Sequence, residues 1–344
     1  KLMKKIIGIL LTVALLLSTM MGCGSPDAAS DGTGENDPAG GSASGTTKTD
    51  LVVTTYTDPK NLNPFQIEGR QAQRINFQIF ERLVNQGEEP GTYEGMLAES
   101  WEFDEDGLGI TMNLRQGVKF HNGQEMTAED VQFSMEYAGT QASASGGFDW
   151  IMFDSVEIID DYTVHIPFSY ECSLTLSALA ANNLNIVCKD VFEEYGSEVG
   201  LHPVGTGPFM LADSADWVLD SSLKLTRFDD YWGNAPKLET INFKFITESS
   251  QAMIELETGN ADLVLDVPAL SYESIESSSD FKLLKFDSVV GDYIHFNCSK
   301  PPFDDVRVRQ AGAYAINQAD IRRAVYLDLG DILFSAITRA IFGY

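Results

Sequence analysis

Cysteine and histidine are scarce in this chain, and their scarcity excludes several classes of protein. The 344 residues include four histidines and four cysteines. The cysteines are Cys23, Cys172, Cys188 and Cys298. Their wide spacing provides neither a disulfide framework nor a Cys-x-x-Cys metal site, and the scattered histidines form no HExxH zinc motif. We therefore expect no metal and no cofactor, and we expect the last three cysteines to be small buried residues.

Motifs of several large enzyme classes are also missing. The sequence has no Gly-x-Ser-x-Gly nucleophile motif, no phosphate-binding GxxxxGK[ST] loop and no GxGxxG, and the short string at 205–207 is too weak to indicate a nucleotide. Among 51 acidic residues, two carboxylates could meet by chance, so their number is no evidence for a glycosidase. We predict that the protein is not an enzyme.

Basic residues are few. The chain has 23 lysines and arginines against 51 aspartates and glutamates, a formal net charge of −28, and no basic cluster. Such a chain repels nucleic acids and anionic lipids, so neither is expected as a partner. The acidity has two explanations, attraction of cationic ligands and ordinary solubility of an exported protein, and the second is favoured.

Long hydrophobic runs are equally rare, and the one present lies at the N-terminus. Residues 6–17 are uncharged and largely apolar, a length typical of a signal peptide and too short for a membrane span. Gly22 before Cys23 is similar to the processing site of lipoproteins, which implies removal of residues 1–22 and acylation of Cys23. An uncleaved membrane anchor or a buried helix is the alternative.

Residues 23–50 are predicted to be a lipidated cysteine followed by a disordered linker. From residue 25 onward the segment is rich in Gly, Ser, Ala, Thr, Asp and Pro, and it has no large apolar side chain to bury. Without residues 1–22, which carry three lysines, the net charge is 20 − 51 = −31. Anchor, stalk and folded body together predict a protein tethered to the outer face of the cytoplasmic membrane.

The remaining 294 residues (344 − 50) are enough for two lobes, and they mix strand and helix patterns without strict alternation. We therefore predict an α/β fold with antiparallel parts. The expected strands are 51–55, 110–114, 209–212, 241–246, 261–267, 283–286 and 293–296, with a hairpin over 155–168. Helices are expected after a Thr127 cap, over 249–258 with Gly259 closing the helix, and from near Val306 and Gln318.

Several motifs follow one another in a specific order. They are AESW at 98–101, TMNLRQGVKFHNG at 111–123, TAEDV at 127–131, VGTGPF at 204–209, YWG at 231–233, IELETGNAD at 254–262 and NCSKPPFDDVRVRQAGAYA at 297–315. Together they resemble the signature of the family 5 extracellular solute-binding proteins of ABC importers. That family includes oligopeptide-, dipeptide- and nickel-binding receptors, and the resemblance extends from residue 51 to about residue 329.

The resemblance implies a two-lobed periplasmic-binding-protein-like (type II) fold with an extra subdomain on lobe I. Lobe I would comprise residues 51–296, with the inserted subdomain at roughly 70–190. Residues 297–344 would begin lobe II. Family members are considerably longer and residues 331–344 match no family segment, so we expect a truncated gene product whose second lobe is largely missing and whose ligand affinity is therefore weak.

The resemblance also implies ligand-contacting residues. They are Glu68 and Gly69 in an Ile-Glu-Gly loop, Tyr293 and His295 on one face of a strand, Asp266 near a strand end, and Phe148 and Trp150 as pocket walls. Each has a structural alternative: Glu68 as a first-turn helix charge, Tyr293 and His295 as core, and Phe148 with Trp150 as ordinary packing. Phe303, Asp304, Asp305 and Arg307 are predicted to be structural, with an aspartate capping the helix and the arginine pairing with carboxylates.

The predicted function is that of a lipid-anchored, monomeric substrate-binding protein that captures di- or oligopeptides for an ABC permease and its ATPase. A nickel-chelate or oligosaccharide receptor of the same family is one alternative. A surface sensing lipoprotein that no longer delivers cargo is another, and an exported hydrolase is the most distant.

Overall fold

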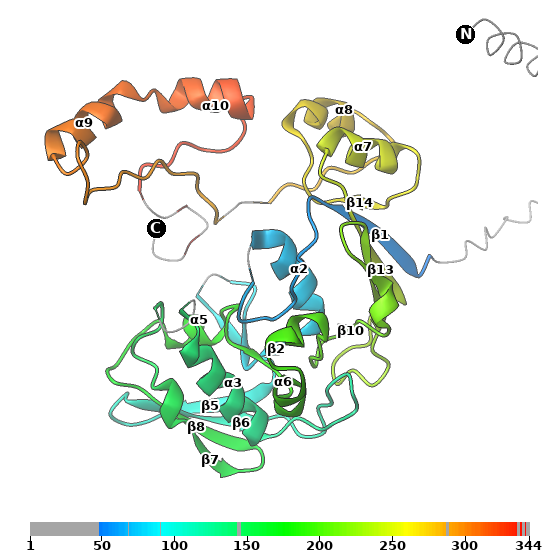
Figure 1. Ribbon diagram of the computed structural model, residues 1–344, viewed down its shortest axis with the longest axis vertical. Helices are drawn as coiled ribbons and strands as arrows, with labels where there is room; N and C mark the ends of the chain where they lie inside the picture. Colours follow the sequence, from blue (N-terminus) through cyan, green and yellow to red (C-terminus); the bar gives the residue numbers. More distant parts are fainter. Residues whose placement is uncertain are drawn as a thin grey trace, which may run out of the picture. The chain divides into compact units, whose positions relative to one another are not determined.

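The computed structural model describes residues 48–67, 69–89, 91–142, 146–286, 289–335, 338 and 341 (Figure 1). All of them belong to one compact unit, Thr47–Tyr344. The predicted signal peptide, Cys23, nearly all of the linker and Glu68 lie outside the described residues.

The main sheet contains the first strand as an interior strand. Its order is β10-β12-β13-β1-β14, and β11 pairs with β12. The strands are β1 (Asp50–Thr55), β10 (Phe209–Met210), β11 (Trp217–Val218), β12 (Ser222–Arg227), β13 (Thr240–Phe245) and β14 (Leu263–Val264). β1 runs parallel to both β13 and β14, which suits its Leu-Val-Val-Thr-Thr run because β-branched residues pack well in a buried central strand.

Two helices accompany the β14 side of this sheet. α7 (Ser249–Glu257) packs Ala252 and Met253 against Val264 of β14 and Ile275 of α8 (Tyr272–Glu276). Gly259 adopts φ +74° just after α7, as predicted for a residue that closes a helix. The predicted strand at 261–267 is only two residues long.

The segment between β1 and β10 contains the smaller sheets. Its four-stranded antiparallel sheet has the order β5-β6-β8-β7, and it lies beside α3 in Figure 1. Its elements are α2 (Gly69–Ile79), β2 (Glu81–Arg82), β3 (Val84–Gln86), β4 (Tyr93–Gly95), β5 (Ala98–Phe103), β6 (Gly109–Leu114), α3 (Ala128–Thr140), β7 (Glu157–Asp160), β8 (Thr163–Pro167), α5 (Thr175–Leu179), β9 (Asn185–Ile186) and α6 (Lys189–Tyr195). Four 3-10 turns complete the fold at Phe153–Ser155, Gly196–Leu201, Ser214–Asp216 and Ala269–Ser271.

One hydrophobic core joins this region to the main sheet. Buried side chains of β6 and β8 belong to the same cluster as those of β1, β12 and β13. The cap of α3 forms as predicted, because the Asp130 carboxylate accepts the backbone N–H of Thr127 at 3.0 Å. The predicted hairpin over 155–168 is confirmed by the antiparallel pairing of β7 with β8.

The C-terminal part confirms two helices and corrects two strands. α9 (Val306–Ala315) and α10 (Gln318–Tyr326) begin where the sequence predicts. The strands expected at 283–286 and 293–296 are absent from the described chain, because no described strand pairs with either segment and an unpaired strand leaves its backbone groups without partners. The expectation of buried cysteines holds for Cys188 but is wrong for Cys298, which is exposed.

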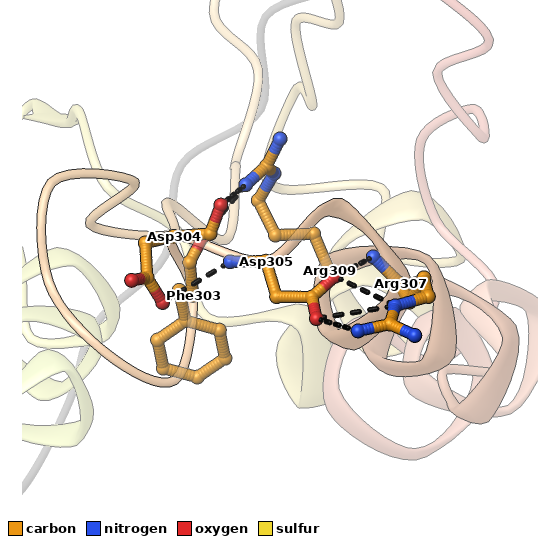
Figure 2. A network of polar contacts seen from close by, with 5 residues as sticks. All are labelled: Phe303, Asp304, Asp305, Arg307 and Arg309. Carbon is orange, nitrogen blue, oxygen red and sulfur yellow. Dashed lines mark hydrogen bonds and ion pairs between the residues drawn. The ribbon is translucent and has the colours of Figure 1, made fainter.

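The start of α9 matches the predicted roles of its charged residues (Figure 2). Asp305 caps the helix by accepting the backbone N–H of Arg307 at 2.8 Å, and it pairs with the Arg307 side chain at 2.6 Å. Arg309 donates back to the carbonyls of Phe303 and Asp304 at 2.7 and 3.1 Å. Residues 303–309 thus cap the start of α9 through hydrogen bonds among themselves.

Candidate functional site: a hollow at the carboxyl edge of the main sheet

The carboxyl ends of three parallel strands meet at one edge of the main sheet. β1, β13 and β14 share this direction, and the chain leaves them at Tyr56, Ile246 and Leu265. In open α/β sheets, ligands bind outside the carboxyl ends of the strands. The loops at this edge are therefore where a ligand site is expected.

A hollow of about 750 Å³ opens there. It lies among the loop after β1, the first turn of α2 and the residues just after α3. Its lining comprises Thr57, Asp58, Pro59, Lys60, Asn61, Phe65, Gln66, Ile67, Gln71, Ala72, Gln141 and Ala142. A smaller hollow of about 310 Å³ shares Phe65 and Ile67 with it and reaches Asn182 and Asn183.

Asp58 fixes the loop that forms one wall of the larger hollow. One of its carboxylate oxygens accepts the backbone N–H of Lys60 at 2.8 Å and the indole N–H of Trp217 at 3.2 Å. The other accepts the backbone N–H of Asp220 at 2.7 Å. Lys60 in turn pairs with the Asp220 carboxylate. The loop after β1 is therefore clamped to the turn between β11 and β12.

The next part of the loop, residues 61–66, is also held by hydrogen bonds. The Asn61 side-chain oxygen accepts the backbone N–H of Asn63 at 2.8 Å, and its amide nitrogen donates to Gln66 at 3.2 Å. The backbone of Leu62 donates to the carbonyl of Gly200 at 2.9 Å. A Cβ on Gly200 would lie 1.7 Å from the Asn61 side-chain oxygen, so only glycine admits this approach.

Two of the predicted ligand residues lie at this edge. Gly69 begins α2 with φ +82°, a conformation that favours glycine, and a Cβ there would meet the Gln71 side-chain oxygen at 3.3 Å. Asp266 follows β14 and pairs with Arg74 of α2 at 3.3 Å, with both side chains partly exposed. This ion pair ties α2 to the β14 end, and it occupies the carboxylate that we expected to contact ligand.

The other described candidates lie elsewhere. Trp150 is 7% exposed, contacts Phe148 edge to face and donates its indole N–H to Thr175 at 3.2 Å, as the packing alternative predicts. Tyr293 is 48% exposed and its ring lies 6.0 Å from that of His295. Neither residue lies on a strand. None of these four residues lines either hollow, and their roles as ligand contacts stay predictions.

Buried Glu81 joins several of the sequence motifs behind the site. Its carboxylate accepts the hydroxyl of Thr206 at 2.8 Å, the phenol of Tyr231 at 2.8 Å and the indole N–H of Trp232 at 2.7 Å. Arg115 lies over the Trp232 ring at 4.8 Å. Burial raises the pKa of Glu81, and the three donors partly offset that rise.

His121 also links two parts of the chain, and it does so with a neutral imidazole. Its ring nitrogens bond the backbone N–H of Gly205 at 3.3 Å and the carbonyl of Gly207 at 2.9 Å, so Nδ1 accepts and Nε2 donates. Burial lowers the pKa of His121 to about 4. A Cβ on Gly205 would come within 2.0 Å of the Ile79 carbonyl, so this loop packs directly on the end of α2.

The described residues contain no group of three or more histidines, cysteines, aspartates or glutamates placed to hold a metal ion. None of the helices in the described chain is long and apolar enough to cross a membrane. The larger hollow presents carboxamides, apolar side chains and the charged groups of Asp58 and Lys60, a lining that suits hydrogen bonding to an organic solute.

Comparison with known proteins identifies the family. The family description "Bacterial extracellular solute-binding proteins, family 5 Middle" matches residues 92–344. The chain belongs to this family. The glutathione-binding protein GsiB of Shigella dysenteriae serotype 1 (strain Sd197) is 28% identical to it over 279 residues, covering 80% of this chain and 54% of GsiB. The chain therefore spans about half the length of the curated relatives it matches.

Solved structures of binding proteins agree with this assignment. The periplasmic binding protein DppA of Helicobacter pylori, in complex with the peptide STSA, has a TM-score of 0.74 and 26% identity, covering 86% of this chain and 62% of DppA. The oligopeptide-binding protein AppA of Bacillus subtilis, in complex with a nonapeptide, has a TM-score of 0.75 and 25% identity, covering 86% of this chain and 59% of AppA. The predicted family and α/β binding-protein fold are confirmed.

The amide residues of the hollow were not among the ligand residues predicted from the sequence. Asn61, Gln66 and Gln71 follow the first predicted strand within 16 residues of its end (71 − 55 = 16). A buried, β-branched strand followed at once by polar side chains is the signal that could have found them, because such residues lie at the ligand-binding edge of a parallel sheet.

Proposed function

We propose that this chain is the ligand-capturing part of a substrate-binding protein of an ABC importer, and that its ligands are peptides. The observation that carries the proposal is the hollow at the carboxyl edge of the β13-β1-β14 trio, in a chain of this family. The peptide complexes of DppA and AppA support peptides as the solute class. Partners would be an ABC permease and its ATPase.

A bound peptide would lie along this edge with its main chain hydrogen-bonded and its side chains in the hollows. Main-chain bonds supply affinity that is independent of peptide sequence, and roomy pockets accept varied side chains. We propose further that Cys23 carries a lipid that holds the monomeric protein at the outer face of the cytoplasmic membrane. Capture outside the membrane followed by release to a permease needs no catalysis.

Thermal unfolding with candidate ligands tests this function. A ligand at 100 times its Kd stabilises a protein by about 2.7 kcal/mol, which corresponds to roughly 5 °C in Tm for a chain of this size. We expect di- to nonapeptides to raise Tm by that order, with nickel–histidine complexes and oligosaccharides as the comparison sets. A shift with the nickel complexes or the oligosaccharides, and none with any peptide, would contradict the proposal.

A further inference from the structure

Among the described residues that line the larger hollow, positive and negative charges balance, although the chain as a whole carries a net charge of −28. In the described part of the lining, the ionisable side chains are Asp58 and Lys60. The Asp58 carboxylate is buried and accepts three hydrogen bonds from the loop and turn that it clamps. Lys60 pairs with Asp220. Neither charge is left uncompensated for a ligand, so a charged ligand group would find no counter-ion in this wall.

The hydrogen-bonding capacity of the hollow comes from carboxamides. Four of its lining residues carry one: Asn61, Gln66, Gln71 and Gln141. Gln71 is half-buried and makes no side-chain hydrogen bond to another described residue. Gln66 is exposed at the rim, and its amide nitrogen donates to no described residue. Each carboxamide offers donors and acceptors together. A half-buried amide without a partner is best satisfied by a ligand group that also both donates and accepts.

The remaining walls restrict the shape of that group without adding charge. Pro59, Phe65, Ile67 and Ala72 supply apolar surface between the amides. Phe65 is 2% exposed and is anchored by the rings of Tyr137 and Phe192 at 5.1 and 5.8 Å. The hollow therefore has an apolar floor at Phe65, which aromatic packing holds in place, and polar side chains at its edges.

We propose that this hollow selects a neutral group that both donates and accepts hydrogen bonds, with Gln66 and Gln71 as the residues that determine the specificity. The inference rests on the proposed function and narrows it. The group would be a side-chain carboxamide of a peptide or the hydroxyls of a sugar attached to one. Carboxylates and ammonium groups are disfavoured because they would lose their hydration without gaining a counter-ion.

Calorimetric titration of the chain with a matched peptide panel tests the proposal. Ala-Xaa-Ala peptides carry glutamine, glutamate, lysine, leucine or glucosylated serine as Xaa, with Xaa moved to each position in turn. At one position we expect glutamine to bind at least about fivefold more tightly than its isostere glutamate, because one neutral hydrogen bond contributes about a factor of five. The glucosylated peptide distinguishes hydroxyl recognition from carboxamide recognition.

Substitutions at Gln71 and Gln66 test whether these two residues cause the preference for glutamine. Gln71→Leu should remove the preference for glutamine while leaving the affinity for the leucine peptide within about twofold, and Gln66→Leu should weaken the preference. Gln86→Leu is the matched control, because Gln86 is exposed on β3 and lines neither hollow. Equal affinity for glutamine, glutamate and lysine peptides would overturn the inference, as would a preference that survives Gln71→Leu. Failure of every peptide to bind would instead overturn the proposed function on which the inference rests.

Discussion

Glu81 is the buried carboxylate on which two sequence motifs meet, since it accepts hydrogen bonds from Thr206 of VGTGPF and from both aromatic residues of YWG. Replacing it by leucine leaves the buried hydroxyl of Thr206 and the partly buried donors of Tyr231 and Trp232 without this acceptor. We expect Glu81→Leu to lower the free energy of unfolding by about 3 kcal/mol and Glu81→Gln by about 1 kcal/mol, because the amide keeps one acceptor. Urea denaturation of the two variants measures both values, and equal losses would contradict the hydrogen-bond argument.

His121 predicts how stability depends on pH. Its folded-state pKa of about 4 lies below the ordinary value of 6.5, so between these values the unfolded chain binds a proton that the native protein excludes. Its contribution is complete above about pH 6.5 and is lost as pH falls to about 4, a change of about 3 kcal/mol.

The variant His121→Gln isolates this contribution from the titration of the carboxylates. At pH 7 the variant should be less stable than the original chain, and the difference should shrink by about 3 kcal/mol between pH 7 and pH 4. Urea unfolding at several pH values follows the difference directly. A difference that stays constant over this range would show that His121 titrates normally in the folded protein.

At the scale of elements, α9 depends on its cap more than on its ion pair. Asp305 accepts the backbone N–H of Arg307, and hydrogen bonding to that arginine lowers the pKa of the aspartate. We expect Asp305→Ala to speed amide hydrogen exchange in the first turn of α9, because an unsatisfied N-terminal amide frays the helix. Arg307→Ala keeps the cap and removes only an exposed pair, so its exchange should change little. The opposite order would show that the ion pair is the stronger contact.

The elements that the sequence predicted correctly are those decided locally. Thr127 with Asp130, Gly259 after α7 and Asp305 before α9 each determine a helix end through bonds within a few residues. The segment 293–296 alternates like a strand, but strand formation needs a partner, and the described chain provides none. Alternation alone could not reveal that.

The candidate site was less predictable for the same physical reason. Gly69 and Asp266 were predicted and lie at the carboxyl edge of the sheet, but the engagement of Asp266 by Arg74 joins residues 192 positions apart. The hollow brings Asn61 and Gln71 together with Gln141 at the end of α3, which depends on how α3 packs. Trp150 is the opposite case: its sequence position fits either a pocket wall or core packing, and its burial, 7% exposed, agrees with packing.

At the scale of the whole molecule, the proposed attachment to the membrane rests on Cys23, which lies outside the described residues. If Cys23 is acylated, the chain should fractionate with membranes and incorporate labelled palmitate when expressed in a bacterial host. Cys23→Ala should abolish the labelling and move the protein to the soluble fraction. Cys298→Ala is the matched control, because Cys298 is exposed and should affect neither. Palmitate labelling that survives in Cys23→Ala would contradict the anchor.

The position of β1 inside the main sheet, between β13 and β14, has a consequence for biosynthesis. Asp50 pairs with Thr240, so the first strand of the folded unit finds its main neighbour 190 residues later in the chain (240 − 50). Contacts of such high sequence separation form late, since a long loop must close before they are rewarded. A nascent chain therefore cannot complete this sheet until β13 and β14 have been synthesised. For the location outside the cytoplasmic membrane proposed above, this delay would keep the sheet incomplete during the interval in which the chain can still be exported.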